Sequence, residues 1–159
     1  MRRLSAIGTC IALASAAVIR AVTAGQLQPV PGDGCSIETI NGKPWPPEPA
    51  HVTATEDIVV TGWAVDPRAH RVPLNLRLRL VPSHGAPVEA PVRHRLLRRD
   101  LIALWHTDAY LAPGFTVTVP SQTLDSGIWR MSLAYGTADQ EVVCANAGAL
   151  DVTHAKPAQ

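Results

Sequence analysis

The stretch "VPLNLRLRLV", residues 72–81, decides the fold class of this 159-residue chain. Every second residue in it is a leucine, so that Leu74, Leu76, Leu78 and Leu80 alternate with Asn75, Arg77, Arg79 and Val81. Successive side chains of a β-strand point to opposite faces of a sheet, whereas a helix would spread leucines at this spacing around its circumference. The stretch therefore predicts a strand with an apolar face and a charged face.

The rest of the chain repeats this strand-like pattern in short runs. Runs that alternate in polarity or are rich in β-branched residues lie at 35–40, 51–55, 58–65, 88–96, 115–119, 128–136 and 140–152. The only helical candidate is "RRDLIALW", residues 98–105, which Asp100 is suited to cap. About seven to nine short strands with almost no helix predict an all-β fold, an antiparallel β-sandwich of immunoglobulin-like type.

The first residues have the layout of a secretory signal peptide. A basic start precedes an apolar run over residues 4–19, and the small residues of "VTA" permit cleavage after Ala24. The run is shorter than the roughly 20 residues that span a bilayer. We therefore expect residues 1–24 to be removed and the mature chain to reach the periplasm or the exterior. An earlier cleavage, after Ala16 or Ala17, is also compatible with the sequence. An uncleaved N-terminal anchor is the alternative.

The mature chain is expected to contain one domain and one disulfide. An irregular lead-in (25–34) precedes the β-sandwich (35–153), and a disordered tail (154–159) follows it. Cys35 and Cys144 are the cysteines left after the leader, and in an oxidising compartment they predict a single bridge. In the chain-entropy model, closing a loop of roughly 110 residues is worth about 4–5 kcal/mol. Two free buried thiols are the alternative.

Basic charge is confined to one central segment. Residues 68–99 hold eight arginines and one acid, whereas residues 25–67 and 100–159 are both acidic on balance. The strands at 72–81 and 88–96, if paired, put four arginines on one face. These are Arg77, Arg79, Arg93 and Arg95. Facing arginines repel, so the sequence leaves two readings open: pairing with carboxylates of neighbouring strands, or an anion-binding surface.

Four short motifs occur in an order that resembles a known module. They are "GWAVD" at 62–66, "RRDL" at 98–101, "GF" at 114–115 and "LDSGIWRMSL" at 124–133. The order resembles a small bacterial immunoglobulin-like β-sandwich module of cell-envelope and surface-polysaccharide proteins, sometimes appended to glycosyltransferases. The resemblance implies location and fold, and it carries no catalytic residues. The flanking cysteines and the proline-rich lead-in depart from the module and suggest a free-standing secreted version.

The same motifs suggest an internal latch between the two turns that contain "GWAVD" and "RRDL". Its expected members are Trp63, Asp66, Arg98, Arg99 and Asp100. Trp63 is expected to pack in the core, on the disulfide or on Phe115, and Gly62 to mark a bulge or a close approach of two backbones. Asp66 is expected either to cap its own turn or to meet one of the arginines. With the latch in place, Asp66→Asn should lower thermal stability more than it changes any binding.

The sequence contains no catalytic signature. It lacks G-x-S-x-G, H-E-x-x-H, paired-cysteine metal motifs and a phosphate loop, and no histidine lies at metal-ligand spacing from either cysteine. We therefore expect a protein that is not an enzyme and that uses no metal or other cofactor. Export makes nucleic acid an unsuitable partner.

Two binding functions fit these features. In the first, an exported module recognises envelope glycan on exposed aromatic rings, with arginines gripping an acidic sugar. The candidate residues are Trp45, Trp105, Tyr110, Arg77, Arg79, Arg93 and Arg95. The alternative role for the tryptophans is to plug an open sheet edge. In the second, the chain is an interaction or structural subunit of an envelope complex that meets a protein through the edge strand at Pro91 or the proline-rich segment. Membrane contact is expected only through an uncleaved leader, if at all.

Overall fold

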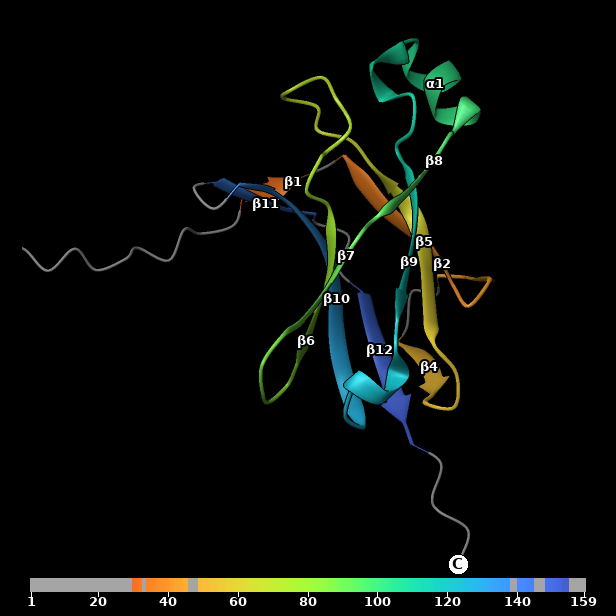
Figure 1. Ribbon diagram of the computed structural model, residues 1–159, viewed down its shortest axis with the longest axis vertical. Helices are drawn as coiled ribbons and strands as arrows, with labels where there is room; N and C mark the ends of the chain where they lie inside the picture. Colours follow the sequence, from red (N-terminus) through yellow and green to blue (C-terminus); the bar gives the residue numbers. More distant parts are fainter. Residues whose placement is uncertain (1–29, 33, 46–48, 138–139, 145–147, 155–159) are drawn as a thin grey trace, which may run out of the picture.

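Two β-sheets stacked face to face make up the computed structural model of the chain (Figure 1). The structure describes residues 30–32, 34–45, 49–137, 140–144 and 148–154. The predicted signal peptide, residues 1–24, lies outside the described residues. In the part of the chain that is described, none of the helices has the length and apolar character needed to cross a bilayer.

The smaller sheet has five antiparallel strands in the order β3-β2-β5-β9-β8. Their bounds are Cys35–Ile40 for β2, Lys43–Pro44 for β3, Ile58–Ala64 for β5, His94–Leu96 for β8 and Gly114–Val119 for β9. Alternation in β5 turns Ile58, Val60 and Gly62 toward the other sheet. These strands therefore supply one wall of the core.

The larger sheet is organised around β10, Gly127–Thr137. One side of β10 pairs with β6, which in turn pairs with β7, and the other side pairs with β12 near its start and with β11 near its end. The bounds are Val30–Gly32 for β1, Ala50–Thr53 for β4, Arg77–Pro82 for β6, Val88–Pro91 for β7, Gln140–Cys144 for β11 and Gly148–Thr153 for β12. β4 lies parallel to β12 and β1 lies parallel to β11.

The strand order is that of an immunoglobulin-like sandwich. The order β2-β5-β9-β8 corresponds to strands A, B, E and D, while β6, β10 and β12 correspond to C, F and G. The predicted all-β sandwich with one short helix is therefore confirmed. The structure divides the described residues into twelve strands, more than predicted, because β1, β3 and β8 are only two or three residues long.

The leucine alternation that predicts the fold holds for β6. Leu76, Leu78 and Leu80 are buried, and Arg77 and Arg79 point to the outer face of the sheet. Side chains from both sheets surround these leucines and include Phe115, Met131, Leu133 and Leu150. Leu74 breaks the pattern and is 80% exposed, because the strand begins only at residue 77.

The predicted return strand at 88–96 is wrong as a single strand. It divides into β7, which pairs with β6, and β8, which pairs with β9 in the opposite sheet. Pro91 ends β7, since it has no N–H to continue the ladder, and the chain crosses between sheets over the buried Val92. Arg93 and Arg95 consequently do not share the face of β6 on which the other two arginines lie, which corrects the expected cluster of four.

A disulfide joins the two sheets. Cys35 at the start of β2 is bonded to Cys144 at the end of β11, with 6.1 Å between their Cα atoms. Both cysteines are buried and belong to the core cluster. The predicted bridge is therefore confirmed.

Two short segments near the predicted domain ends are ordered by contacts. β1, within the expected irregular lead-in, pairs with β11. His154, the first residue of the expected tail, has its ring nitrogen Nε2 2.8 Å from the Leu124 carbonyl oxygen, and its backbone N–H donates to Ser126. Residues 155–159 of that tail lie outside the described residues.

Candidate functional site

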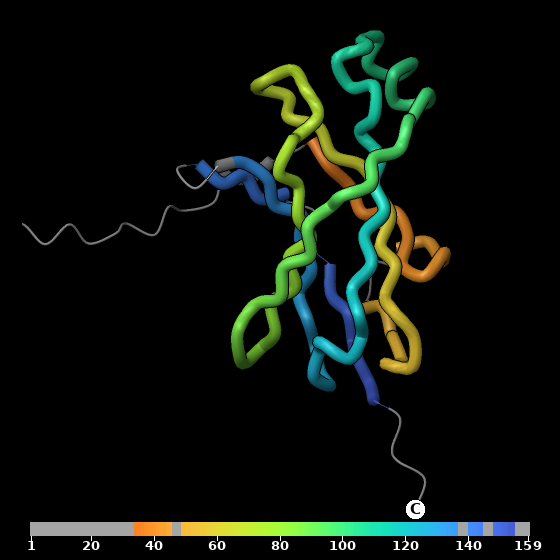
Figure 2. The backbone as a smooth tube through the Cα atoms, viewed as in Figure 1, coloured from red at the N-terminus to blue at the C-terminus, as the bar shows by residue number. Residues whose placement is uncertain are grey.

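Two loops project from one end of the sandwich, the end opposite the one at which β12 finishes (Figure 2). One connects β5 to β6, and the other connects β8 to β9 and contains α1, Arg99–Trp105, and the short 3-10 helix Asp108–Tyr110. We call these two loops, together with the last two residues of β8, the loop end; it comprises residues 65–76 and 95–113. Loops at the ends of a sandwich are the usual binding surfaces of this architecture, because the sheets hold them in place.

The α1 loop is fixed to the smaller sheet by three aromatic rings. Trp105 meets Trp63 and Tyr110 edge to face, with 5.2 Å between ring centroids in both pairs. Both tryptophans remain partly exposed, while Tyr110 is buried. Tyr110 is therefore an internal packing residue, not a platform for a sugar.

Trp63 lies on the outer face of β5, which corrects the prediction that it anchors the core. The inward position next to it belongs to Gly62, where a Cβ would come within 2.1 Å of the Ser36 carbonyl oxygen and 3.0 Å of the Phe115 ring. The pairing of β2 with β5 also shifts register between Ile37 and Thr39. The predicted close approach at the glycine is thus confirmed, and alternation sends the tryptophan outward.

An ion-pair cluster links the α1 loop to β2. Arg98 donates to both carboxylate oxygens of Glu38, at 2.7 and 3.0 Å, and to both of Asp100, at 2.9 and 2.7 Å. Hydrogen bonds to Asp100 and Glu38 raise the pKa of Arg98, and the hydrogen bond from Arg98 lowers the pKa of Asp100 to about 2. Because the pKa of Asp100 is lowered in the folded state, the pair contributes its full stability at pH values above the ordinary carboxyl pKa. That stability is lost as the pH falls toward 2.

Asp66 contacts its own turn and not the α1 loop. Its carboxylate accepts from the backbone N–H groups of Arg68 and Ala69, both at 3.1 Å, and its backbone pairs with Arg71. Arg99 is exposed, and no acidic group in the described part of the chain lies within ion-pair distance of it. The contacts that join the two turns to the body are Trp63 with Trp105 and Glu38 with Arg98. Sequence reasoning missed Glu38.

The role of Asp66 leads to a revised stability prediction. Asp66→Asn should leave thermal stability almost unchanged, because an asparagine side-chain oxygen accepts the same two N–H groups. Asp66→Ala should lower the free energy of unfolding by about 1 kcal/mol through the loss of those bonds. Thermal unfolding of both variants, with the exposed Asp57→Ala as a control, checks this. Equal losses for the asparagine and alanine variants would contradict it.

The arginines of β6 are paired on the outer face of the larger sheet. Arg79 binds Glu141 of β11 through two hydrogen bonds, at 2.9 and 2.8 Å, and Glu89 of β7 at 2.7 Å. Arg77 also pairs with Glu89, at 3.1 Å, and with Glu141. Partial burial acts to raise the pKa of Glu89, but the hydrogen bonds and charges of both arginines lower it overall. These arginines are therefore engaged by protein carboxylates.

Glu141 should be the most sensitive member of this network. Glu141→Gln removes the charge between Arg77 and Arg79 while keeping the side-chain shape, and leaves both arginines to a single carboxylate. We expect a loss of about 1–3 kcal/mol in the free energy of unfolding. Urea unfolding at neutral pH measures it, and the exposed Glu56→Gln is the control. A change no larger than that of the control would show that the network contributes nothing.

The remaining two predicted arginines have different surroundings. Arg93 is exposed. Arg95 is partly buried and donates through Nη2 to the Pro73 carbonyl oxygen, which ties β8 to the loop between β5 and β6. Its Nη1 atom is buried and has no hydrogen-bond partner among the described residues, and burial lowers the pKa of Arg95. Arg95 therefore joins the two loops of the loop end.

Trp45 closes the side of the sandwich. Its backbone N–H donates to the Glu38 carbonyl oxygen at 2.7 Å, and its ring lies against Gly148 of β12, where a Cβ would fall 1.4 Å from ring atom Cζ2. Trp45 also packs against the core cluster. It therefore acts as the plug that the sequence left open as an alternative.

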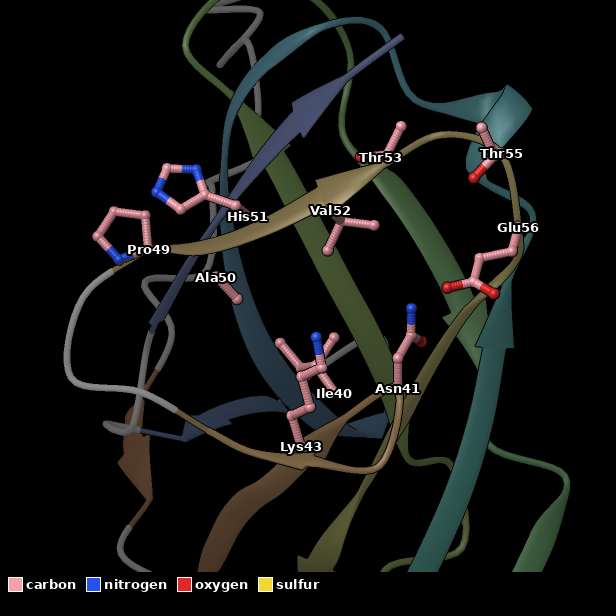
Figure 3. Close-up of a pocket in the computed structure, with 10 residues that line it drawn as sticks. All are labelled: Ile40, Asn41, Lys43, Pro49, Ala50, His51, Val52, Thr53, Thr55 and Glu56. Carbon is pink, nitrogen blue, oxygen red and sulfur yellow. The ribbon is translucent and has the colours of Figure 1, made fainter. Parts of the chain in front are cut away.

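A cleft of about 620 Å³ opens beside this edge, between β4 and the turn that joins β2 to β3 (Figure 3). Its polar lining residues are Asn41, Lys43, His51, Thr53, Thr55 and Glu56. Two of them already have partners: the Asn41 side chain accepts from the Val59 N–H at 2.7 Å, and the His51 ring lies 2.9 Å from the Asp151 carboxylate. No local sequence signal marks this cleft, because its residues come from separate segments.

Exposed apolar side chains gather at the loop end. Of the seven large hydrophobic residues that are exposed in the described part of the chain, five lie there. They are Leu74, Leu96, Leu97, Leu104 and Leu111. The other two, Val81 and Ile128, lie on strands of the larger sheet. Four of the five lie on the two loops, and Leu96 ends β8, the strand that leads into the α1 loop.

The fold and its loop end define the chain as an immunoglobulin-like β-sandwich with an apolar loop surface. Comparison with protein-family models, with curated proteins and with solved structures finds no match.

Proposed function

We propose that the chain is an exported, non-catalytic binding module of the bacterial cell envelope, and that the loop end is its binding surface. The observation that carries the proposal is that five exposed leucines lie on two loops, and on the end of β8, at one end of the sandwich. Leu74 and Leu104 are 80% and 66% exposed, so they contribute little to folding and are available to a target. The signal-peptide layout of residues 1–24 and the resemblance of the motifs to envelope modules support the location.

An apolar target suits this surface better than a free glycan does. Sugar binding needs open aromatic faces and fixed polar groups, but the Trp105 ring packs against the rings of Trp63 and Tyr110. Arg77 and Arg79, which an acidic glycan would use, are held by two carboxylates. Glycan recognition would therefore rest on the exposed part of Trp105 and on the unpaired arginines of the loop end.

Sedimentation with isolated cell envelopes tests the proposal. The exported form of the protein should bind the envelopes. The Leu97→Ser/Leu104→Ser variant should bind at least about fivefold more weakly, because the leucines supply the contact area. The matched control is Val81→Ser/Ile128→Ser, which changes exposed apolar residues away from the loop end and should bind like the wild type.

The glycan alternative has its own readout. Isolated envelope polysaccharide should leave Trp105 fluorescence unchanged, judged against Trp105→Phe because the chain contains four tryptophans. A fluorescence response to the polysaccharide, together with unchanged envelope binding by the leucine variant, would overturn an apolar target and favour glycan recognition.

A further inference from the structure

We infer that the loop end docks on the anionic surface of a lipid bilayer. The leucines would enter the boundary between headgroups and acyl chains, and the arginines would lie at the level of the phosphates. This inference rests on the proposed function, because it takes the loop end as the binding surface and names its partner. From the sequence we expect membrane contact only through an uncleaved leader. The inferred contact is a second one, and it does not involve the leader.

A hydrogen bond joins the two loops at their base. Arg95, at the base of the α1 loop, donates to the Pro73 carbonyl oxygen in the other loop, directly beside Leu74. The α1 loop in turn is held to the smaller sheet by Trp63 and by the pairing of Arg98 with Glu38. Both loops project from the same end of the molecule (Figures 1 and 2), and the five exposed leucines belong to these loops and to the end of β8.

The apolar positions have the distribution of a membrane-inserting surface. Leu97 precedes α1, Leu104 lies within it, and Leu111 follows the 3-10 helix, so the leucines are spread over short projecting segments. A fluid bilayer accepts separate projecting side chains without a matching pocket, whereas a protein partner needs one complementary patch. Trp105, partly exposed beside them, is a residue typical of the membrane interface.

Charge complementarity favours an anionic partner and sets the orientation. The loop end holds five arginines and three aspartates, a balance of +2. The rest of residues 25–159 holds six basic and ten acidic side chains, a balance of −4. Arg68, Arg71 and Arg99 are exposed, and no ion pair is formed by them within the described residues. An anionic surface would attract the loop end and repel the body.

Two of the three loop-end aspartates are already engaged. Asp100 binds Arg98, and the Asp66 carboxylate accepts backbone N–H groups of its own turn. Asp108 is the third, and it lies at the start of the 3-10 helix. The exposed arginines therefore face little competition from carboxylates of the loop end.

Vesicle sedimentation with the exported form tests the inference. We expect binding to vesicles of phosphatidylcholine mixed with phosphatidylglycerol to be about tenfold or more stronger than to pure phosphatidylcholine, and to weaken with added salt. Leu97→Ser/Leu104→Ser should reduce binding about tenfold, and Leu74→Ser, in the other loop, should reduce it less. Val81→Ser/Ile128→Ser is the control, and thermal unfolding verifies that each variant is folded.

The arginines and the depth of insertion have separate readouts. Arg68→Gln/Arg71→Gln/Arg99→Gln should remove the preference for phosphatidylglycerol while leaving weak binding through the leucines. Brominated lipids should quench wild-type tryptophan fluorescence and quench Trp105→Phe less.

Each failure has a distinct meaning. Envelope binding that depends on Leu97 and Leu104 without any binding to the vesicles would overturn the lipid partner and leave the proposed function standing. Envelope binding that ignores these leucines would overturn both. Equal binding to a soluble acidic polysaccharide, unaffected by the leucine variants, would reduce the loop end to a general anion site and also overturn the inference.

Discussion

Replacing Cys35 and Cys144 together by serine is expected to lower the free energy of unfolding by about 4–5 kcal/mol. The bridge spans 109 residues of sequence, so its loss releases nearly the whole sandwich in the unfolded chain. In the chain-entropy model, the longer the loop, the more unfolded conformations the cross-link removes. An effect of this size would be a large fraction of the stability of an ordinary domain, which is about 5–15 kcal/mol.

Because the bridge joins the two sheets, its removal should lower the stability of the whole sandwich in a single unfolding transition. Cys35 lies in the smaller sheet and Cys144 in the larger, and both are buried in the core cluster. Urea unfolding of the oxidised protein and of Cys35→Ser/Cys144→Ser gives the difference. Treating the serine variant with a reductant should change nothing further. A difference below about 1 kcal/mol would mean that the bridge does not constrain the unfolded chain.

The alternation of side chains was enough to predict the fold class, and the cysteine count was enough to predict the bridge. The alternation around Leu78 fixes which face of β6 is buried, and that alternation depends only on neighbours in sequence. The bridge between Cys35 and Cys144 follows from counting cysteines after the leader. Leu74 shows the limit of the pattern. It continues the alternation in the sequence but precedes the strand, so the alternation does not predict its burial.

Contacts between distant segments decided most of what was missed. The partners of Arg98 and Arg79 are Glu38 and Glu141, which lie 60 and 62 residues away, so no local pattern identifies them. The crossing of the chain from one sheet to the other depends on how the sheets stack, and Pro91 was its only local signal. The loop end was missed for the same reason, since its exposed leucines come from two segments that only the fold brings to one end of the sandwich.

Trp63 was misplaced although the sequence held the needed signal. Alternation from Ile58 makes Gly62 inward and Trp63 outward, but the size of the indole ring favoured a core position. The inward glycine is explained by the Ser36 carbonyl oxygen, which a Cβ would approach to 2.1 Å, and by the Phe115 ring at 3.0 Å. This pairing of a large and a small residue across two strands is set by packing, which composition does not reveal.

Phe115→Ala is expected to lower the free energy of unfolding by about 3–5 kcal/mol. Phe115 is fully buried on β9, and its ring lies 3.0 Å from the place where a Cβ on Gly62 would stand. Removing the ring leaves a cavity between the sheets that rigid strands fill poorly. Urea unfolding measures the loss, and Ile128→Ala, at an exposed position, should cost less than about 0.5 kcal/mol.

The double variant distinguishes this packing from a simple exchange of volume. Gly62→Ala alone should destabilise, because its Cβ would stand 2.1 Å from the Ser36 carbonyl oxygen as well as near the Phe115 ring. Adding Phe115→Ala removes the ring but leaves the backbone oxygen in place. The losses in the free energy of unfolding of the two single variants should therefore nearly add. A double variant that is more stable than Phe115→Ala alone would contradict this, because it would show that β2 can shift and that only the ring requires a glycine at this position.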